Sequence, residues 1–305
     1  MRILVTGGAG FIGSHLCESL SKKHEVICMD NMAAGKAGNL RGMDVEFLRQ
    51  DIRKPFSVDC GLIFNMASPA SPADYQLHPM ETIEANVFGM RNVLECARKC
   101  GARLVHASTS EVYGDPLVHP QKESYWGNVN TLGPRACYDE SKRFAETLCY
   151  NYHKAYGTRA VLARIFNTYG PRMRADDGRA VPNFIMQALS GKDITIYGSG
   201  RQTRSFCYIS DLVDGLQRLA FSRINFGAFN LGNPSEITLL ELAEKVRKIC
   251  GSKSGIAKMP LPQDDPRQRR PDISKVAKAT GWKPQTPLDE GLKRTVAWFR
   301  SEVKR

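Results

Sequence analysis

The sequence predicts an α/β protein, a doubly wound parallel sheet with a smaller C-terminal α/β lobe. Two observations predict it. Short apolar runs alternate with helical segments through the first half of the chain, and a glycine-rich turn joins the first run to the first helix. The apolar runs are almost continuously hydrophobic, which is typical of parallel strands covered on both faces. Repeated strand-helix-strand units then imply right-handed crossovers.

Six strands and three helices are expected in the first half. The strands correspond to residues 2–7, 25–30, 45–51, 62–68, 103–109 and 160–167. The first helix follows the glycine turn, because Ile12, Leu16 and Leu20 recur every four residues on one helical face. Longer helices are expected at 81–100 and 139–156.

The pattern changes after about residue 170, where a polar loop reads GPRMRADDGRAVP. Shorter elements follow: helices at 182–190, from 211, at 238–250 and at 287–302, strands at 194–198, 206–210 and 227–232, and a charged, proline-rich loop at 260–272. We therefore predict two lobes, 1–170 and 171–305. They are expected to pack closely, with the chain crossing between them, because no flexible linker separates them.

Composition limits the class of protein. The chain has 305 residues, of which 42% are hydrophobic and 24% charged, as in ordinary globular proteins. No stretch approaches the ~18 apolar residues of a membrane span, and no leader peptide pattern opens the sequence. Nine cysteines without a C-x-x-C pair favour free thiols over disulfides. We expect a cytoplasmic protein without a membrane anchor.

The formal charge of +12 fits either a solvated basic surface or an anionic partner. No basic run is interleaved with aromatic residues, which disfavours nucleic acid and leaves a phosphorylated small molecule. His78, His106, His119 and His153 show no metal-ligand spacing with the cysteines. No metal is predicted.

The turn after the first strand reads TGGAGFIG and contains Gly8-x-Gly10-x-x-Gly13 as well as Gly7-x-x-Gly10-x-x-Gly13. Glycines there permit a tight turn and let the backbone approach a pyrophosphate at the positive helix N-terminus. In this context the pattern predicts a Rossmann-type dinucleotide site. The alternative is a turn that serves helix packing alone.

Asp30 ends the second strand, near the ~20-residue distance at which an acid binds the ribose of NAD and repels the 2′-phosphate of NADP. Asn31 follows in place of an arginine, so NAD is the predicted cofactor. Asp51 and Ile52, at the end of the third strand, are expected near the adenine, although Asp51 also fits a solvated strand end. The predicted cofactor set is completed by Phe11, Ile12 and Ala67.

Tyr138 and Lys142, in CYDESKR, are four residues apart and so share a helical face. A tyrosine with a pKa near ~10 is a poor base at neutral pH. A neighbouring ammonium and a cationic nicotinamide favour the phenolate, which takes a proton from an alcohol while hydride leaves carbon. Thr109, at the end of the fifth strand, is expected to hydrogen-bond the same oxygen. By itself, Tyr-x-x-x-Lys is also common on exposed helices.

Together these residues match an extended short-chain dehydrogenase/reductase. More narrowly, the chain resembles UDP-glucuronate decarboxylases (UDP-xylose synthases) in the segments TGGAGFIGSHL, ASPASP, ASTSEVYGDP, HPQKESYWG, GPRACYDESKR, RIFNTYGPRM, DGRAVPNFI, YGSGRQTRSF and DDPRQRRPDI. The resemblance extends from Met1 to about residue 300. It implies that 1–170 bind NAD and that 171–305 bind the UDP-sugar. The membrane anchor of the family is not expected here.

The resemblance implies a three-step reaction. The C4 hydroxyl of UDP-glucuronate is oxidised to a ketone with NAD, the C6 carboxylate leaves as CO2, and C5 is protonated before C4 is reduced to give UDP-xylose. The net redox change is zero, so the cofactor is expected to stay bound. The catalytic set implied by the resemblance is Thr109, Ser110, Glu111, Tyr138, Lys142 and Arg269.

Ser110 distinguishes this reaction from dehydration. Dehydratases of the superfamily resemble Thr-Asp-Glu at this place, where the Asp protonates a leaving hydroxyl, whereas this sequence reads Thr109-Ser110-Glu111. By resemblance, Glu111 positions the sugar or a water near C5 and takes part in proton transfer. We expect its pKa to be raised in a closed site beside a substrate carboxylate. Without the surrounding match, Glu111 reads as a solvated loop acid.

Two arginines match substrate-binding positions of the family. Arg204 is expected to face the diphosphate, and Arg269 to lie near both the diphosphate and the reacting sugar, because guanidinium groups form forked bonds to phosphate and carboxylate. The neighbouring Arg270 is the alternative to Arg269. Further expected substrate contacts are Tyr75, Asn167, Arg172 and Asn183.

Three alternatives remain open. The chain resembles other NAD-dependent sugar-nucleotide enzymes, so a 4-epimerase or a 4,6-dehydratase is the first. A catalytically silent NAD-binding or RNA-binding relative is the second, supported only by the charge of +12. Release of a 4-ketopentose is the third. The family also implies a homodimer through a four-helix bundle, to which each subunit contributes the helices at 81–100 and 139–156.

Overall fold

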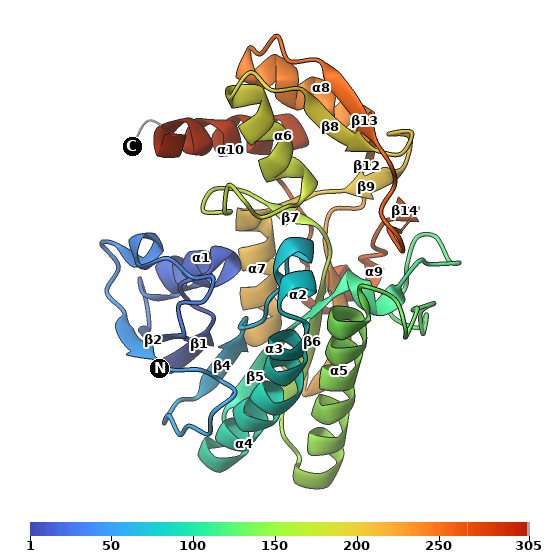
Figure 1. The fold of residues 1–305 in the computed structure, drawn as a ribbon. Coiled ribbons are helices and arrows are strands. Elements are labelled where there is room, and N and C mark those ends of the chain that lie inside the picture. The colour runs from blue at the N-terminus through green and yellow to red at the C-terminus, as the bar shows by residue number, and fades with distance from the viewer. Residues whose placement is uncertain (267, 304–305) are drawn as a thin grey trace.

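The computed structural model describes residues 1–266 and 268–303. Its largest sheet has seven parallel strands in the order β11-β6-β5-β4-β1-β2-β3 (Figure 1). The strands are β1 (Arg2–Thr6), β2 (Glu25–Asp30), β3 (Glu46–Arg49), β4 (Leu62–Asn65), β5 (Arg103–Thr109), β6 (Ala160–Ile165) and β11 (Phe226–Leu231). The predicted doubly wound parallel sheet is confirmed.

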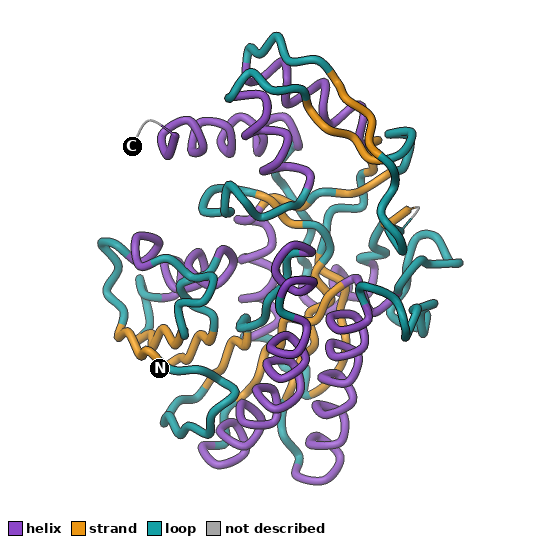
Figure 2. Tube along the Cα trace, in the orientation of Figure 1, coloured by secondary structure: helices purple, strands orange, loops and turns teal. Residues whose placement is uncertain are grey.

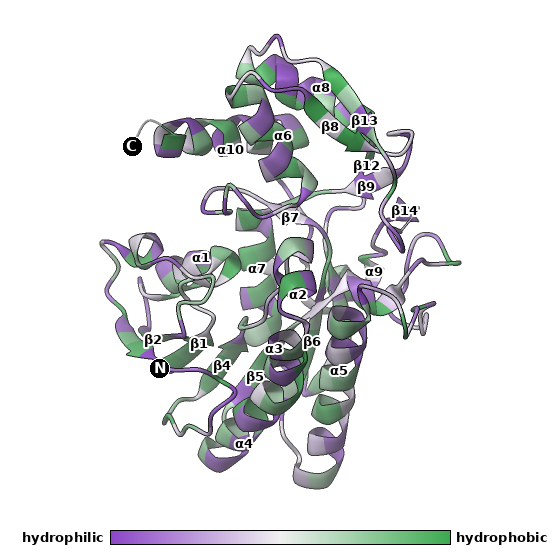
Figure 3. Cartoon of the chain, viewed as in Figure 1, coloured by the Kyte–Doolittle hydropathy of each residue, from purple (hydrophilic) through white to green (hydrophobic). Residues whose placement is uncertain are grey.

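Helices cover both faces of this sheet, and each face has its own core. On one face lie α1 (Phe11–Leu20) and α7 (Ile209–Ala220), and on the other α4 (Met90–Cys100) and α5 (Ala136–Tyr156). Alternate residues of β1 serve the two cores, Ile3 and Val5 one and Leu4 the other, because successive side chains of a strand point to opposite faces. This explains why the strands are hydrophobic almost throughout (Figure 3).

The helix expected at 81–100 is interrupted. It consists of α3 (Pro79–Glu84), a π-helical turn η2 (Ala85–Gly89) and α4, and it follows the short α2 (Pro72–Leu77). At Gly89 the helix runs against the third strand's end, where a Cβ would lie 2.7 Å from Ile52 Cδ1. The extra residue of the π turn has no signature in the hydrophobic pattern, so the sequence predicted a single helix.

The C-terminal lobe is built from helices and short strands (Figure 2). The helices are α6 (Ala180–Leu189), α8 (Leu239–Cys250), α9 (Ser274–Thr280) and α10 (Leu288–Val303). The strands are β7 (Thr168–Tyr169), β8 (Ile194–Tyr197), β9 (Thr203–Ser205), β10 (Cys207–Tyr208), β12 (Glu236–Thr238), β13 (Ile256–Met259) and β14 (Gln268–Arg269). They pair as β10-β7, β12-β9-β14 and β13-β8.

The chain crosses between the lobes. Helix α7 and strand β11 follow the predicted boundary at residue 170, yet α7 packs on α1 and β11 pairs with β6. The segment expected as a loop at 260–272 contains β14, which pairs with β9. A two-residue strand is too short to give a periodic pattern. Among the helices of the described residues, none is long and apolar enough to cross a membrane.

The order of the strands indicates where a ligand site lies on the large sheet. Strands β4 and β1 are neighbours although β2 and β3 lie beyond β1, so the chain changes direction between them. In open α/β sheets, ligands bind at the carboxyl ends of the strands at such a point. The glycine turn after β1 and the polar residues after β5 both lie at this edge, facing the C-terminal lobe (Figure 1).

Candidate active site

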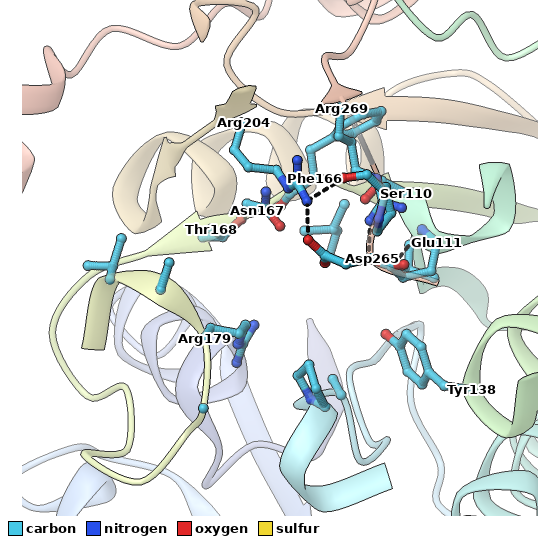
Figure 4. A pocket seen from close by; sticks show the side chains of 18 of the residues that line it. Ser110, Glu111, Tyr138, Phe166, Asn167, Thr168, Arg179, Arg204, Asp265 and Arg269 are labelled. Carbon is cyan, nitrogen blue, oxygen red and sulfur yellow. Dashed lines mark hydrogen bonds and ion pairs between the residues drawn. The ribbon is translucent and has the colours of Figure 1, made fainter. Parts of the chain in front are cut away.

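A cavity of about 410 Å³ lies between the carboxyl edge of the sheet and the C-terminal lobe. Eleven of the predicted site residues line it: Ile12, Tyr75, Thr109, Ser110, Glu111, Tyr138, Lys142, Asn167, Asn183, Arg204 and Arg269. Figure 4 shows Ser110, Glu111 and Arg269 together on one side of the cavity, with Tyr138 facing the cavity from another side. The structure thus brings together residues from both lobes.

The glycine turn is packed too tightly for side chains at two of its glycines. Gly7 has a φ of +67°, and a Cβ on it would lie 2.7 Å from the backbone nitrogen of Ala67 at the end of β4. A Cβ on Gly13 would collide with the Gly7 carbonyl oxygen. Helix α1 begins at Phe11 and Ile12 after Gly10, and its first turn holds no acidic residue. Its positive end is therefore free of competing anionic side chains of its own.

The residues predicted for the adenosine end lie at the ends of β2 and β3, outside the cavity lining. The Asp30 carboxylate accepts hydrogen bonds from the backbone N–H groups of Ala9 (3.0 Å) and Met32 (2.8 Å). Burial raises the pKa of Asp30, and these two bonds oppose that shift. Asn31 donates to Asp51 at 3.1 Å.

Ile52 is buried, and its carbonyl accepts a hydrogen bond from Asn92 at 2.8 Å. Asp51 is also bonded by Arg53, whose guanidinium donates to both of its carboxylate oxygens. An acid at the end of β2 and the open glycine turn suit the ribose and pyrophosphate of NAD. The residues present therefore fit the predicted cofactor.

Tyr138 and Lys142 lie on one face of α5, as predicted. Lys142 Nζ donates to the Ala107 carbonyl at 2.9 Å and lies 5.8 Å from the centre of the Tyr138 ring. Burial raises the pKa of Tyr138, although a hydrogen bond with Thr109 lowers it. Burial also lowers the pKa of Lys142 to about 7. The protein groups alone therefore do not favour the phenolate, because desolvation of both side chains outweighs the ammonium.

Glu111 lies in the short helical turn η3 (Ser110–Tyr113), where Thr109 Oγ1 accepts from its backbone N–H. Its carboxylate accepts from Arg135 Nη2 at 2.6 Å and also from Arg269 Nη1. Burial alone raises the pKa of Glu111, but the two guanidinium groups lower it to about 2. The expected raised pKa is thus wrong for the protein's own groups, because the sequence did not indicate two arginine partners.

Arg204 and Arg269 face each other across the pairing of β9 and β14, where they are register partners. Arg204 donates to Asp265 at 2.9 Å, and Arg269 to the Gly114 carbonyl at 3.0 Å (Figure 4 shows the Arg204–Asp265 bond). Arg270 does not line the cavity; its guanidinium lies 3.7 Å from Glu236. Arg269, within β14, therefore lines the cavity, whereas Arg270, directly after the strand, does not.

Three further predicted contacts have different surroundings. Tyr75 is buried and stacks on Tyr138, with ring centres 5.0 Å apart and an interplanar angle of 7°. Asn183 lines the cavity and donates to the Gly178 carbonyl at 3.0 Å. Arg172 does not line the cavity, because its guanidinium pairs with Glu18 of α1 at 2.6 Å.

Sequence reasoning missed Arg135, Arg179 and Asp265, which also line the cavity. Arg135 lies three residues before Tyr138, and its guanidinium is 5.9 Å from the centre of the Tyr75 ring. Arg179 pairs with the buried Asp177 and points into the cavity (Figure 4). All three stand in segments rich in charge, so nothing in their spacing separates them from surface residues.

A glycine turn on a doubly wound sheet, with a Thr-Tyr-Lys set in the adjoining cavity, defines a nucleotide-dependent enzyme of the short-chain dehydrogenase/reductase type. The chain belongs to the NAD dependent epimerase/dehydratase family, whose model matches residues 3–232. Among its curated relatives are UDP-glucuronic acid decarboxylases. It is 50% identical to UDP-glucuronic acid decarboxylase 1 of Danio rerio, over 99% of this chain and 73% of the relative. It is 53% identical to UDP-glucuronic acid decarboxylase 6 of Arabidopsis thaliana, over 96% of this chain and 87% of the relative.

Solved structures of related enzymes share the whole fold. UDP-glucose 4-epimerase of Thermotoga maritima, with UDP-glucose, matches with a TM-score of 0.92 and 29% identity, over 99% of this chain and 100% of that chain. UDP-glucuronic acid 4-epimerase of Bacillus cereus, in complex with UDP-glucuronic acid and NAD, matches with a TM-score of 0.89 and 28% identity, over the same shares. The prediction of the family from sequence is confirmed.

Proposed function

We propose that this chain is a carboxy-lyase that converts UDP-glucuronate to UDP-xylose and CO2, with NAD kept bound and recycled. The identity of about half of the residues over nearly the full length to UDP-glucuronic acid decarboxylases supports it. The observation that carries it within the cavity is the neighbouring pair of Ser110 and Glu111. A neutral hydroxyl stands where dehydration needs an acid, next to a carboxylate held by two arginines.

The glycine turn and Asp30 hold the cofactor in this proposal. Gly7, Gly10 and Gly13 leave the backbone open to the pyrophosphate, and Asp30 accepts from the ribose hydroxyls. NAD bound there supplies a hydride acceptor for C4 of the sugar and later returns the hydride. Asn31 and Asp51 support the adenosine end through their mutual hydrogen bond.

Tyr138 and Thr109 contact the C4 hydroxyl, and Tyr138 exchanges its proton. The two side chains share a hydrogen bond, so a sugar hydroxyl placed at the same point contacts both. Tyr138 takes the C4 proton when C4 is oxidised and gives it back when the ketone is reduced. Lys142, 5.8 Å from the ring, stabilises the phenolate in its charged form.

Arginines bind the anionic substrate. Arg204 and Arg269 stand side by side on β9 and β14, which suits forked bonds to a diphosphate. Asp265 accepts a hydrogen bond from Arg204. A bound diphosphate must therefore either displace the Asp265 carboxylate or share the Arg204 guanidinium with it. Asn167 and Asn183 complete the proposed substrate contacts from the cavity wall, as does Tyr75 from its stack on Tyr138.

The chemistry at C5 and C6 is assigned to Glu111. Once C4 is a ketone, the C6 carboxylate is β to it and leaves as CO2, with its electron pair delocalised as an enolate. The Glu111 carboxylate is held by Arg135 and Arg269 at the cavity wall, and the proposal puts the substrate's carboxylate next to it. Glu111 then takes part in delivering a proton to C5.

A 4-epimerase is the second candidate, because a UDP-glucuronic acid 4-epimerase shares the fold with a TM-score of 0.89. The test is incubation of the purified protein with UDP-glucuronate, followed by measurement of CO2 and identification of the nucleotide sugar. CO2 with a UDP-pentose supports the proposal. UDP-galacturonate without CO2 would favour the epimerase.

The proposal extends to assembly and location. A homodimer through a four-helix bundle is supported by exposed aromatic residues on the two helical segments expected at that interface, among them Phe88 (57% exposed) and Phe144 (46% exposed). A cytoplasmic location is supported by the nine free cysteines, which suit a reducing compartment. In this proposal residues 1–170 bind NAD and residues 171–305 bind the UDP-sugar. Helix α7 and strand β11 belong to the second segment but pack on the large sheet and its helices.

A further inference from the structure

The proposed reaction consumes one proton, and the inference below rests on that function. A carboxylate leaves as CO2 and a hydrogen takes its place on C5, so each turnover binds one proton from outside the substrate. Tyr138 cannot supply it, because the proton it takes from C4 returns to C4. Glu111 does not store one, since its two arginine partners hold its pKa at about 2. A buried acid that holds the proton before decarboxylation would supply it.

Asp139 is a buried acid placed to do this. It follows Tyr138 in the first turn of α5, is 5% exposed, and its Oδ1 is buried without a hydrogen-bond partner among the described residues. Its Oδ2 lies 4.0 Å from Arg135 Nε. An ionised carboxylate with an unpartnered oxygen at such depth is costly, so the neutral acid is the stable form.

Arg135 connects this acid to the cavity. The same guanidinium that approaches Asp139 through Nε donates through Nη2 to Glu111 at 2.6 Å. Two carboxyl groups therefore compete for one guanidinium, and the one that it approaches more closely is the one that is ionised. We propose that Asp139 is the proton reserve for C5, passing its proton to Glu111 as Arg135 shifts from Glu111 toward Asp139.

The charges that face Asp139 agree with one proton shared between the two acids. Burial and, after it, the negative charge of Glu111 raise the pKa of Asp139 to about 8, against the lowering effect of Arg135 and Arg269. Glu140, on the same helix, also raises it, and the aromatic rings of Tyr75 and Tyr138 stack nearby. A substrate carboxylate arriving at Glu111 competes for the same arginines and so makes Glu111 more basic.

The proton balance closes over one turnover. Asp139 loses a proton to Glu111, whose carboxyl group then protonates the enolate carbon C5 and returns to the carboxylate. Asp139 takes up a proton from solvent before the next turnover. No electron is transferred in these steps, and Asp139, which does not line the cavity, acts through Glu111 as a positioning residue.

The test compares Asp139→Asn and Asp139→Ser with Glu140→Gln, which removes a half-exposed carboxylate one residue away. We expect kcat on UDP-glucuronate to fall about 100-fold in both Asp139 variants, as for loss of an acid–base group. KM should change less than about twofold, and an NADH absorbance should accumulate because C4 oxidation precedes the blocked step. The wild-type kcat should decline as pH rises through about 8, and this decline should be absent from the Asp139 variants and present in Glu140→Gln.

Infrared spectroscopy gives a measurement independent of turnover. A protonated carboxyl band should be present in the wild type at neutral pH, lost at pH well above 8, and missing from the Asp139 variants. Wild-type kcat and pH profile in the Asp139 variants, an equal change in Glu140→Gln, or no such band would overturn the proposal. A wild-type protein that releases no CO2 would refute the function instead, and the band would still report the state of Asp139.

Discussion

Arg269 and Glu111 form an ion pair inside the cavity although 158 residues separate them in sequence. Glu111 follows strand β5 of the large sheet, and Arg269 lies on β14 of the C-terminal lobe, so the pair joins the two lobes at the site. The Arg269 side chain is only 3% exposed. Removing one partner of such a pair leaves a buried charge without compensation, which costs more than the pair itself contributes.

Glu111→Gln is therefore expected to lower the free energy of unfolding by about 3 kcal/mol. Denaturant unfolding measures this. The control is Glu244→Gln, which removes a partner of Arg247 in a pair with side chains 38% and 45% exposed, where a loss below about 1 kcal/mol is expected. Equal losses in the two variants would show that Arg269 does not depend on Glu111.

The loss of stability in Glu111→Gln should depend on pH. The pKa of Glu111 is lowered from 4.5 in the unfolded chain to about 2 in the folded chain, after its arginine partners outweigh the effect of burial. Its contribution to stability is thus complete above about pH 4.5 and is lost as pH falls toward 2. The difference in unfolding free energy between wild type and Glu111→Gln should shrink over that interval. A difference that stays constant would contradict the lowered pKa.

Tyr138→Phe is expected to stop the reaction earlier than Glu111→Gln. Without the phenol, C4 oxidation should slow by at least about 100-fold, and no NADH absorbance should develop with UDP-glucuronate. Glu111→Gln should instead accumulate that absorbance, because its defect follows C4 oxidation. Stability should change by only about 1 kcal/mol in Tyr138→Phe, which loses one hydrogen bond. Both variants stalling before any absorbance develops would refute their separate roles.

Sequence and structure agree where local pattern decides. The strands, the glycine turn and the i,i+4 pair of Tyr138 and Lys142 follow from periodicity and spacing, because those features depend on neighbouring residues. The roles of Arg269 and Glu111 in one site were expected only through resemblance to a family, and their ion pair was not predicted. Arg135 and Asp139 could not be identified at all, since their importance comes from contacts of one guanidinium with two acids, which no spacing encodes.

The pKa shifts of the site residues could not be predicted from the sequence either. A raised pKa was predicted for Glu111 from burial, but the sign of the shift depends on how many guanidinium groups reach its oxygens. Likewise, the ammonium of Lys142 was expected to lower the pKa of Tyr138, yet both side chains are buried and burial dominates. Desolvation and ion pairing act in opposite directions, and only the packed structure fixes their balance.

Lys142→Met tests that balance. The pKa of Lys142 falls from 10.5 in the unfolded chain to about 7 in the folded chain because of burial, so its charge destabilises the fold fully below pH 7 and progressively less as pH rises to 10.5. Relative to wild type, the variant should gain stability at pH 6 and lose that gain toward pH 10. Denaturant unfolding at several pH values checks this. A gain that grows with pH would contradict the lowered pKa.

The proposed dimer is tested by placing a charge on the helices at 81–100 and 139–156. Phe88→Glu and Phe144→Glu are expected to give a monomer by light scattering, since a carboxylate disrupts an apolar bundle interface. Phe221→Glu changes a side chain of similar exposure, 49%, after the end of α7, and should leave the dimer intact. A wild-type monomer would refute the dimer, and dissociation by the Phe221 variant alone would place the interface elsewhere.

The most direct measurement is the fate of UDP-glucuronate. Purified protein is incubated with UDP-glucuronate labelled with ¹³C at C6, and the gas phase and the nucleotide sugars are analysed over time. One labelled CO2 should appear for each UDP-xylose formed, without added cofactor if NAD remains bound, and Tyr138→Phe should form neither. Conversion to UDP-galacturonate with the label retained at C6, or no reaction in the presence of added NAD, would contradict decarboxylation.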